Sequence, residues 1–233
     1  MECVARLWTS GRHQIATIRL PQEDRREYPG LRQGHHRAAG GRSLQRLHFR
    51  RRQDLASHQG RCRSQQLRRP HLEVLNAARG AKLRVFYAMH HRYRPGDYET
   101  WKYVAPIQKG AWQHRTFEFG TWGGEFRAEF VPVPGEIVAQ EHWCSSGFAN
   151  TDLDLQLKKH GIHQLIIIGL IAHTCIESTV RFAAELGYQV TVVKDATADY
   201  SDEMMHAALD INIPNYANAV VTAKEVVDSL SSL

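Results

Sequence analysis

The 233-residue sequence has no run of about 18 apolar residues, so it offers no candidate for a membrane-spanning helix. Its first residues, MECVARLWTSGRHQ, lack the apolar stretch of a secretory signal, and we expect none. Only four cysteines are present, without CxxC spacing, which argues against a dense disulfide framework and against a zinc site. These absences favour a reducing, cytoplasmic setting.

Lysine is missing from residues 1–70, which hold 16 arginines and five acidic residues, a net charge of +11. Residues 71–233 hold the other 14 basic residues and 19 acidic ones, a net charge of −5. An arginine-rich arm can bind nucleic acid, but such arms usually mix arginine with lysine. An unstructured tail and a gene read in the wrong frame are the other two interpretations.

Residues 1–70 also lack a sustained apolar period of either 3.6 or 2 residues. Residues 42–59 read RSLQRLHFRRRQDLASHQ, and one choice of synonymous codons, shifted by one base, encodes DPYNDFISEGGKIWPRIK. That peptide has the pattern of a strand end, a turn and a helix start. We therefore expect residues 1–70 to be an irregular, disordered or out-of-frame segment, and not a nucleic-acid-binding arm.

From His71 onward, helical and strand patterns alternate, as in a parallel sheet covered by helices on both faces. The patterning predicts an α/β domain over residues 71–233. No internal repeat or linker interrupts it. We expect helices at 71–80, 151–160, 202–210 and 223–231, one further helix beginning near Cys175, and strands at 83–88, 136–140, 165–168, 189–193 and 219–222.

The segment around Cys175 carries the clearest chemical signal. An apolar run, Leu165–Ile168, ends at Gly169, and a short loop then places Cys175 at the start of a helical pattern. The macrodipole and unpaired N–H groups of a helix N-terminus favour a thiolate. This placement suits a cysteine nucleophile, although a buried structural cysteine fits the same pattern.

Two stretches, SGFANTDLDLQLKKHGI and GLIAHTCIESTVRFAAELGYQVTVVKDATADY, resemble the isochorismatase-like cysteine hydrolases over about residues 71–233. The resemblance implies a three-layer α-β-α, Rossmann-like fold with a central, mainly parallel sheet. It also implies a Cys-Asp-Lys triad that hydrolyses amide, ureide or related C–N bonds of small molecules.

In this family the residue at the position of Cys175 is the nucleophile. Its backbone N–H and that of Ile171 would stabilise the oxyanion, and a cis peptide bond is expected between Leu170 and Ile171. The family's general base is an aspartate in a D-x-x-N-D motif after the first strand. Residues Arg42–Leu47 hold that place without a carboxylate, whereas the out-of-frame peptide DPYNDF supplies it. We therefore expect the first strand to be missing or disordered, and activity to fall by about two to four orders of magnitude.

The family's lysine lies four residues before the S-[GA]-F motif, and here that position holds His142, next to Glu141. Either side chain could orient or polarise a substrate, and His142 fits equally well as a core or rim histidine. The resemblance places four aromatic or imidazole side chains at the substrate pocket, although the same residues could fill the core or an interface: His90, Trp122, Trp143 and Phe148.

No cofactor or metal is expected. Adjacent residues His90 and His91 point apart on a strand, and Gly120, Gly123 and Gly124 form no phosphate-binding pattern. Asp195 and Asp199 follow a strand, where they would either order the pocket or cap the next helix.

The leading hypothesis is a homo-oligomeric hydrolase of a small molecule, inactive if the aspartate base is truly absent. The alternatives are a catalytically dead α/β module for binding or oligomerisation, and a nucleic-acid-associated protein that uses the arginine-rich arm.

Overall fold

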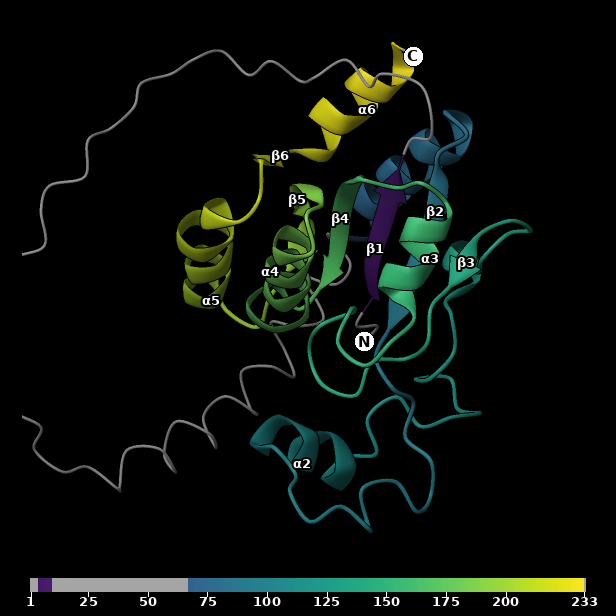
Figure 1. Ribbon diagram of the computed structural model, residues 1–233, viewed down its shortest axis with the longest axis vertical. Coiled ribbons are helices and arrows are strands. Elements are labelled where there is room, and N and C mark those ends of the chain that lie inside the picture. The colour runs from purple at the N-terminus through teal and green to yellow at the C-terminus, as the bar shows by residue number, and fades with distance from the viewer. Residues whose placement is uncertain (1–3, 10–66, 233) are drawn as a thin grey trace, which may run out of the picture.

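The computed structural model describes residues 4–9 and 67–232, and it contains a six-stranded sheet in the order β3-β2-β1-β4-β5-β6 (Figure 1). The strands are β1 (Val4–Thr9), β2 (Arg84–Met89), β3 (Ile137–Val138), β4 (Gln164–Leu170), β5 (Gln189–Ala198) and β6 (Ala219–Val221).

Five of these strands share one direction. β2 pairs with β3 in parallel, as β4 does with β5 and β5 with β6. β1 is antiparallel to both of its neighbours, β2 and β4, so these two strands are parallel to each other. The mainly parallel α/β sheet is confirmed, and the carboxyl ends of its five parallel strands lie along one edge, where ligands bind in such folds.

β1 is a strand that the sequence analysis missed. The expectation was a missing or disordered first strand, yet residues 4–9 occupy the position between β2 and β4, with Val4 opposite Met89 and Thr9 opposite Arg84. Six residues are too few for a reliable period, and backbone pairing on both sides places them in the sheet. Residues 10–66, including Arg42–Leu47 and most of the arginine-rich segment, lie outside the described residues.

The helices follow the predicted alternation with shifted ends. They span residues 67–80, α2 (Pro106–Gln113), α3 (Leu153–Lys159), α4 (Glu177–Glu185), α5 (Asp202–His206) and α6 (Ala223–Ser231). Four shorter turns accompany them: η1 (Ala128–Phe130), η2 (Ala172–Ile176), η3 (Ala207–Asn212) and η4 (Ile213–Asn215). No helix within residues 67–232 combines the length and apolar content needed to cross a bilayer.

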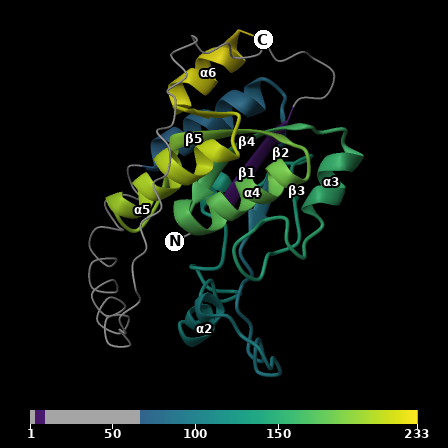
Figure 2. The same ribbon diagram turned by 60° about the vertical axis from the view of Figure 1, so that its left-hand side comes forward.

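The strands bury alternate residues on opposite faces, which gives two cores and three layers (Figure 2). Phe86 and Ile167 belong to the core that includes buried residues of α3, α4 and η3. Their neighbours Tyr87 and Ile168 belong to the core shared with α6 and the helix over 67–80. Burial on both faces explains why the strands read as continuous apolar runs rather than as alternating patterns.

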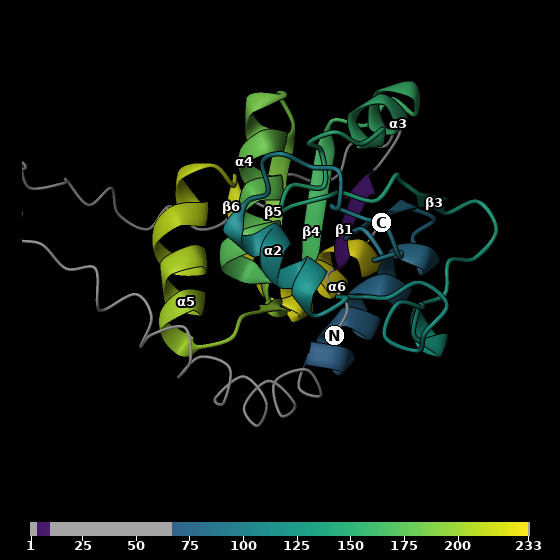
Figure 3. The ribbon, with the colours of Figure 1, turned by 90° about the horizontal axis from the view of Figure 1, so that it is seen from below.

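The chain between β2 and β3, residues 90–136, leaves the sheet at the carboxyl edge. It carries α2, which has no buried residue and lies below the sheet and the other helices in Figure 1, so that it stands in front of the strands when the molecule is seen from below (Figure 3). The sequence analysis described this segment only as polar and aromatic, and it did not predict α2.

Candidate active site

The carboxyl edge of the sheet gathers most of the predicted site residues. His90 directly follows β2 and forms a parallel bridge with His142, beyond β3. Ile171 directly follows β4 and begins the turn that contains Cys175. β1 starts at the same edge, because Val4 lies opposite Met89. Three strand spacings, about 14 Å, therefore separate the backbones of β3 and β4.

Cys175 lies in η2, a single π-helical turn that continues directly into α4. Its thiol is not in a disulfide, and the residue is only 3 % exposed. The Thr174 hydroxyl donates a hydrogen bond to Cys175 Sγ at 3.7 Å. Cys175 thus occupies the first turn of a longer helical segment, where the helix dipole favours a negative charge on sulfur.

The peptide bond between Leu170 and Ile171 is cis, as expected. The Ile171 carbonyl accepts hydrogen bonds from the N–H groups of Thr174 at 3.2 Å and Ile176 at 3.1 Å. These two bonds close the turn around Cys175.

His142 is 1 % exposed, and neither of its ring nitrogens has a hydrogen-bond partner among the described residues. Burial, together with the charge of the nearby His90, lowers the pKa of His142 to about 3. The ring is therefore neutral at pH 7. One nitrogen of a neutral imidazole carries a proton and the other accepts one, so this side chain can donate to or accept from a bound molecule.

Glu141 is held by two residues at the end of β2. Arg92 donates to it from Nε at 2.6 Å and from its backbone N–H at 2.9 Å, and His91 Nδ1 lies 3.3 Å away. Burial would raise the pKa of Glu141, but hydrogen bonds from His91 and Arg92 outweigh it and lower the pKa to about 2. A carboxylate so strongly ionised is a poor proton acceptor at pH 7, so Glu141 is better suited to positioning.

His91 connects this ion pair to an aromatic cluster. Its ring stacks on Trp143, with centroids 3.6 Å apart, while Nε2 contacts Asp97 at 2.8 Å. Desolvation lowers the pKa of His91, but the hydrogen bonds to Glu141 and Asp97 prevail and raise it. Tyr98 packs edge-on against Trp143, so the predicted pocket residue Trp143 is fixed in place.

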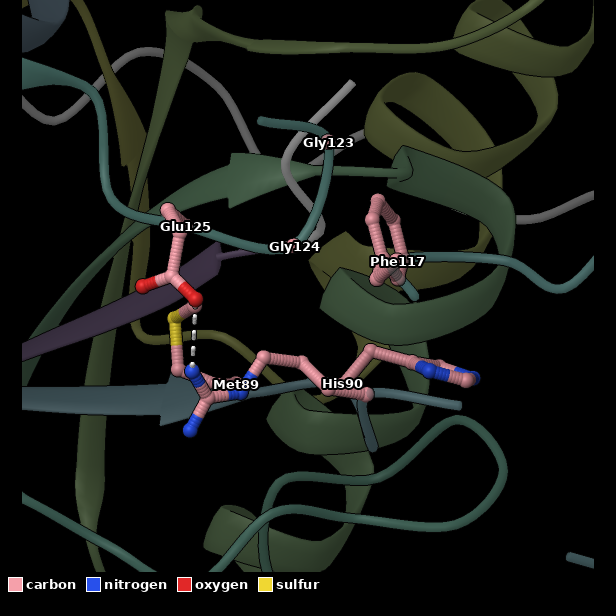
Figure 4. A pocket seen from close by; sticks show the side chains of 7 residues that line it. Met89, His90, Phe117, Gly123, Gly124 and Glu125 are labelled. Atoms are coloured by element: carbon pink, nitrogen blue, oxygen red, sulfur yellow. Dashed lines mark ion pairs between the residues drawn. The ribbon is translucent and has the colours of Figure 1, made fainter. Parts of the chain in front are cut away.

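His90 lines a small cavity of about 10 Å³ between the end of β2 and the 117–125 stretch (Figure 4). Its Nδ1 contacts the His91 carbonyl at 2.8 Å, so Nδ1 carries the proton and Nε2 presents a lone pair. Burial lowers the pKa of His90. The cavity, which Arg92 and Glu125 also line, has room for about one water molecule and is too small for a substrate.

Comparisons with known proteins agree with this arrangement. The family profile described as the isochorismatase domain matches residues 56–225. The chain belongs to the isochorismatase family. The match begins at residue 56, beyond Arg42–Leu47, where the sequence analysis expects the place of the family's aspartate motif.

Two curated relatives are ureidoacrylate amidohydrolases, both named RutB. The one from Caulobacter segnis is 32 % identical over 170 residues, covering 69 % of this chain and 71 % of the relative. The one from Enterobacter sp. is 37 % identical over 112 residues, covering 48 % of each, so this chain spans about half the length of that relative. Among solved structures, the N-carbamoylsarcosine amidase from Thermoplasma acidophilum is 25 % identical, with a TM-score of 0.54, covering 69 % of this chain and 84 % of that one.

The predicted site residues fall into groups within this isochorismatase-family fold. Ile171 and Cys175 share one turn, and Glu141, His142, Trp143 and His90 cluster at the ends of β2 and β3. Two predicted pocket residues lie elsewhere. Phe148 is 6 % exposed and packs against Tyr188 in the core, because the hydrogen bond from the Gly147 N–H to Thr179 Oγ1 holds its loop against α4. Trp122 is 84 % exposed on the segment between β2 and β3.

The sequence analysis left the role of Asp199 open, between ordering the pocket and capping the next helix. In the structure the carboxylate of Asp199 contacts His173, two residues before Cys175, and Ser201 caps α5 instead. The position of Asp199 directly after a strand indicated that it lies at the carboxyl edge of the sheet. Only the pairing of β4 with β5 shows that it reaches the turn of Cys175.

Proposed function

We propose that this isochorismatase-family protein hydrolyses an amide or ureide C–N bond of a small molecule, with Cys175 as nucleophile. The observation that carries the proposal is the position of Cys175, in the first turn of a helical segment at the carboxyl edge of the sheet. The names of the relatives, ureidoacrylate amidohydrolase and N-carbamoylsarcosine amidase, support a substrate of the ureide or amide class.

The chemistry runs in two steps. The thiol of Cys175 loses its proton and the thiolate attacks the carbonyl carbon, while the backbone N–H groups of Ile171 and Cys175 stabilise the oxyanion. The C–N bond then breaks as the proton lost by the thiol passes, by way of solvent, to the leaving nitrogen. Water then hydrolyses the thioester-type intermediate, which releases the acid product and restores the thiol. The neutral imidazole of His142, in the slot of the family's lysine, would polarise the substrate, and Glu141 would hold the His91–Arg92 side of the pocket.

The thiol proton needs an acceptor. Residues Arg42–Leu47 supply no carboxylate, so turnover should lie about two to four orders of magnitude below that of a protein with the aspartate. The same observation favours the second candidate, a catalytically dead α/β binding or oligomerisation module. The two candidates differ in whether Cys175 forms a covalent intermediate.

The test is mass spectrometry of the full-length protein quenched during incubation with ureidoacrylate or N-carbamoylsarcosine. We expect an acyl adduct on the Cys175 peptide and slow release of product, both abolished in C175S and retained in C144S. Product release by C175S at the wild-type rate would refute the cysteine mechanism. Absence of both adduct and product with a panel of ureides and amides would favour the dead module.

Sequencing the coding DNA over codons 20–72 tests the out-of-frame hypothesis. A single-base shift that encodes DPYNDF should give a protein whose kcat is about two to four orders of magnitude higher. If no neighbouring frame encodes a carboxylate-bearing strand, the out-of-frame hypothesis is wrong.

We further propose that residues 71–233 act as one hydrolase domain in a cytoplasmic homo-oligomer. The thiols of Cys144 and Cys175 suit a reducing compartment. Exposed aromatic side chains on the segment between β2 and β3, Tyr103 at 82 % and Trp122 at 84 %, suit a subunit interface. Light scattering after size exclusion should give a mass of at least twice 26.6 kDa, and W122S should lower it.

A further inference from the structure

Asp199 lies beside the turn of Cys175 because of the pairing between two strands. Leu170, the last residue of β4, pairs with Ala198, the last residue of β5. β4 is followed directly by Ile171, the residue before η2, and β5 is followed directly by Asp199. The carboxyl ends of these neighbouring parallel strands therefore bring Asp199 to the start of η2.

The side chain of Asp199 is fully buried, and its carboxylate accepts hydrogen bonds from His173 and Tyr200. Its Oδ2 accepts from the backbone N–H of His173 at 2.8 Å and from His173 Nδ1 at 2.6 Å. Its Oδ1 lies 2.7 Å from His173 Nδ1 and accepts from the backbone N–H of Tyr200 at 2.6 Å. Because a carboxylate only accepts, Nδ1 of His173 carries the proton. One side chain thus holds both the backbone and the ring of a residue two positions before Cys175.

We propose that Asp199 is a positioning residue that holds the Cys175 turn closed. This role rests on the proposed function only in its consequence for catalysis. The hydrogen bonds from His173 to Asp199, which we call the clamp, are a property of the turn itself. η2 is a single turn, and the first N–H groups of a helical segment have no partner within the segment. Asp199, at the end of the neighbouring strand, accepts from the backbone N–H of His173. Its bond to the imidazole holds the His173 ring in place beside the turn.

The same strand provides a matched control. Asp195 lies four residues before Asp199, and its Oδ1 accepts from the backbone N–H of Ala223 at 2.7 Å. In this bond too a carboxylate near the end of β5 accepts from the first turn of a helical segment, but Asp195 is exposed and the helix is α6, on the other face of the sheet from α4. Loss of Asp195 should destabilise the fold without opening the turn of Cys175.

The experiment is alkylation of the full-length protein by iodoacetamide at pH 7.5, with the rate at each cysteine measured by peptide mapping. Cys175 is 3 % exposed, so its alkylation needs local opening of the turn. We expect D199A to alkylate Cys175 about tenfold faster than wild type, because hydrogen bonds to a charged group are lost. We expect D199N to alkylate Cys175 within about threefold of the wild-type rate, since an amide can still accept from the His173 N–H and donate to Nδ1 in the other tautomer.

D195A should lower the melting temperature but alkylate Cys175 at the wild-type rate, and Cys144 should react alike in all variants. Any of three results would overturn the positioning role. Cys175 could be alkylated in D199A at the wild-type rate, or D199N could accelerate its alkylation as much as D199A does. In the third, D195A would accelerate it as much as D199A does. If D199A does not fold, H173A keeps the proposal testable. It leaves the side chain of Asp199 in place and should accelerate alkylation about threefold, and no acceleration would overturn the role.

These readouts need no substrate, so the clamp and the hydrolase can fail separately. Accelerated alkylation in D199A, with neither acyl adduct nor product formed by wild type from the panel of ureides and amides, would support the clamp and count against the hydrolase. An acyl adduct in wild type, with unchanged alkylation of Cys175 in D199A, would support the hydrolase and overturn the clamp.

Discussion

Arg92 binds Glu141 through two different groups, its backbone N–H at 2.9 Å and its side-chain Nε at 2.6 Å. The residues come from the ends of adjacent parallel strands, β2 and β3, and each side chain is about one quarter exposed. The pair fixes the start of the segment between β2 and β3 against the residue that precedes His142. The polar side of the candidate site is therefore held by partly buried charges rather than by apolar packing.

Replacing Arg92 should destabilise the protein measurably. R92A leaves the Glu141 carboxylate with one fewer charged donor, and we expect a loss of about 1–3 kcal/mol in the free energy of unfolding, measured by urea denaturation. R94A is the control, because Arg94 is exposed and its guanidinium lies over the Phe119 ring. We expect R94A to cost no more than about 1 kcal/mol. Equal losses in the two variants would contradict this account of the ion pair.

The pKa of Glu141, lowered to about 2, predicts a loss of stability in acid. A carboxyl whose folded pKa lies below its unfolded value stabilises the fold above the unfolded pKa, and this contribution disappears as pH falls toward 2. Stability measured between pH 5 and pH 2 should therefore fall less steeply in E141Q than in wild type. Parallel pH curves for the two proteins would show that Glu141 is not the group responsible.

His91 predicts an effect of the opposite sign. Its folded pKa is raised, so its contribution is fully present below the unfolded value near 6.5 and is lost as pH rises through the folded pKa. Urea denaturation at pH 5.5 and pH 8.5 should show a larger decrease in wild type than in H91Q. H114Q serves as the control, because His114 is exposed. If H91Q and wild type lose the same stability between these two pH values, the prediction fails.

Buried His142 should oppose folding in acid. Its pKa of about 3 lies below that of a histidine in the unfolded chain, so the unfolded state binds the extra proton as pH falls below 6.5. H142L has a similar volume and loses no hydrogen bond to the described residues. We expect it to be within about 1 kcal/mol of wild type at pH 8 and more stable than wild type at pH 5. Its hydrolytic rate should fall by about 10²–10³ if His142 polarises the substrate.

Gly147 has a steric reason for its small size. A Cβ at this position would meet Ala88 Cβ at 2.9 Å, and the Gly147 N–H donates to Thr179 Oγ1 at 3.0 Å. G147A should therefore destabilise the protein by about 1–3 kcal/mol in thermal or urea unfolding. G110A, in the exposed helix α2 with nothing within 4 Å of its new Cβ, should stabilise by about 0.5–1 kcal/mol. A stable G147A would mean that β2 shifts to make room.

The sequence was sufficient for much of the fold and part of the site. Runs such as Leu165–Ile168 and Val190–Val193 predicted buried parallel strands, since strands covered on both faces are apolar at every position. The placement of Cys175 after one of these runs predicted a thiol at the start of a helix. The S-G-F motif located His142 by counting, without any knowledge of the sheet.

Other features depend on pairings between distant segments. The strand over residues 4–9 has no distinctive period, and only its ladders with β2 and β4 define its place and its reversed direction. β5 extends to Ala198, five residues past its predicted end, because the register with β4 shifts between Ile167 and Gly169.

By itself, then, the sequence determined most of the helices and strands from residue 71 onward, though not β1 or α2, and where the thiol lies along the chain, because apolar runs and helix starts are local properties of residue type. The tertiary structure alone decided that Asp199 reaches the turn of Cys175 while Asp195 accepts from the first N–H of α6, and that Arg92 and His91 keep Glu141 ionised. These contacts join residues 26 to 50 positions apart, and no local pattern encodes which strand ends meet.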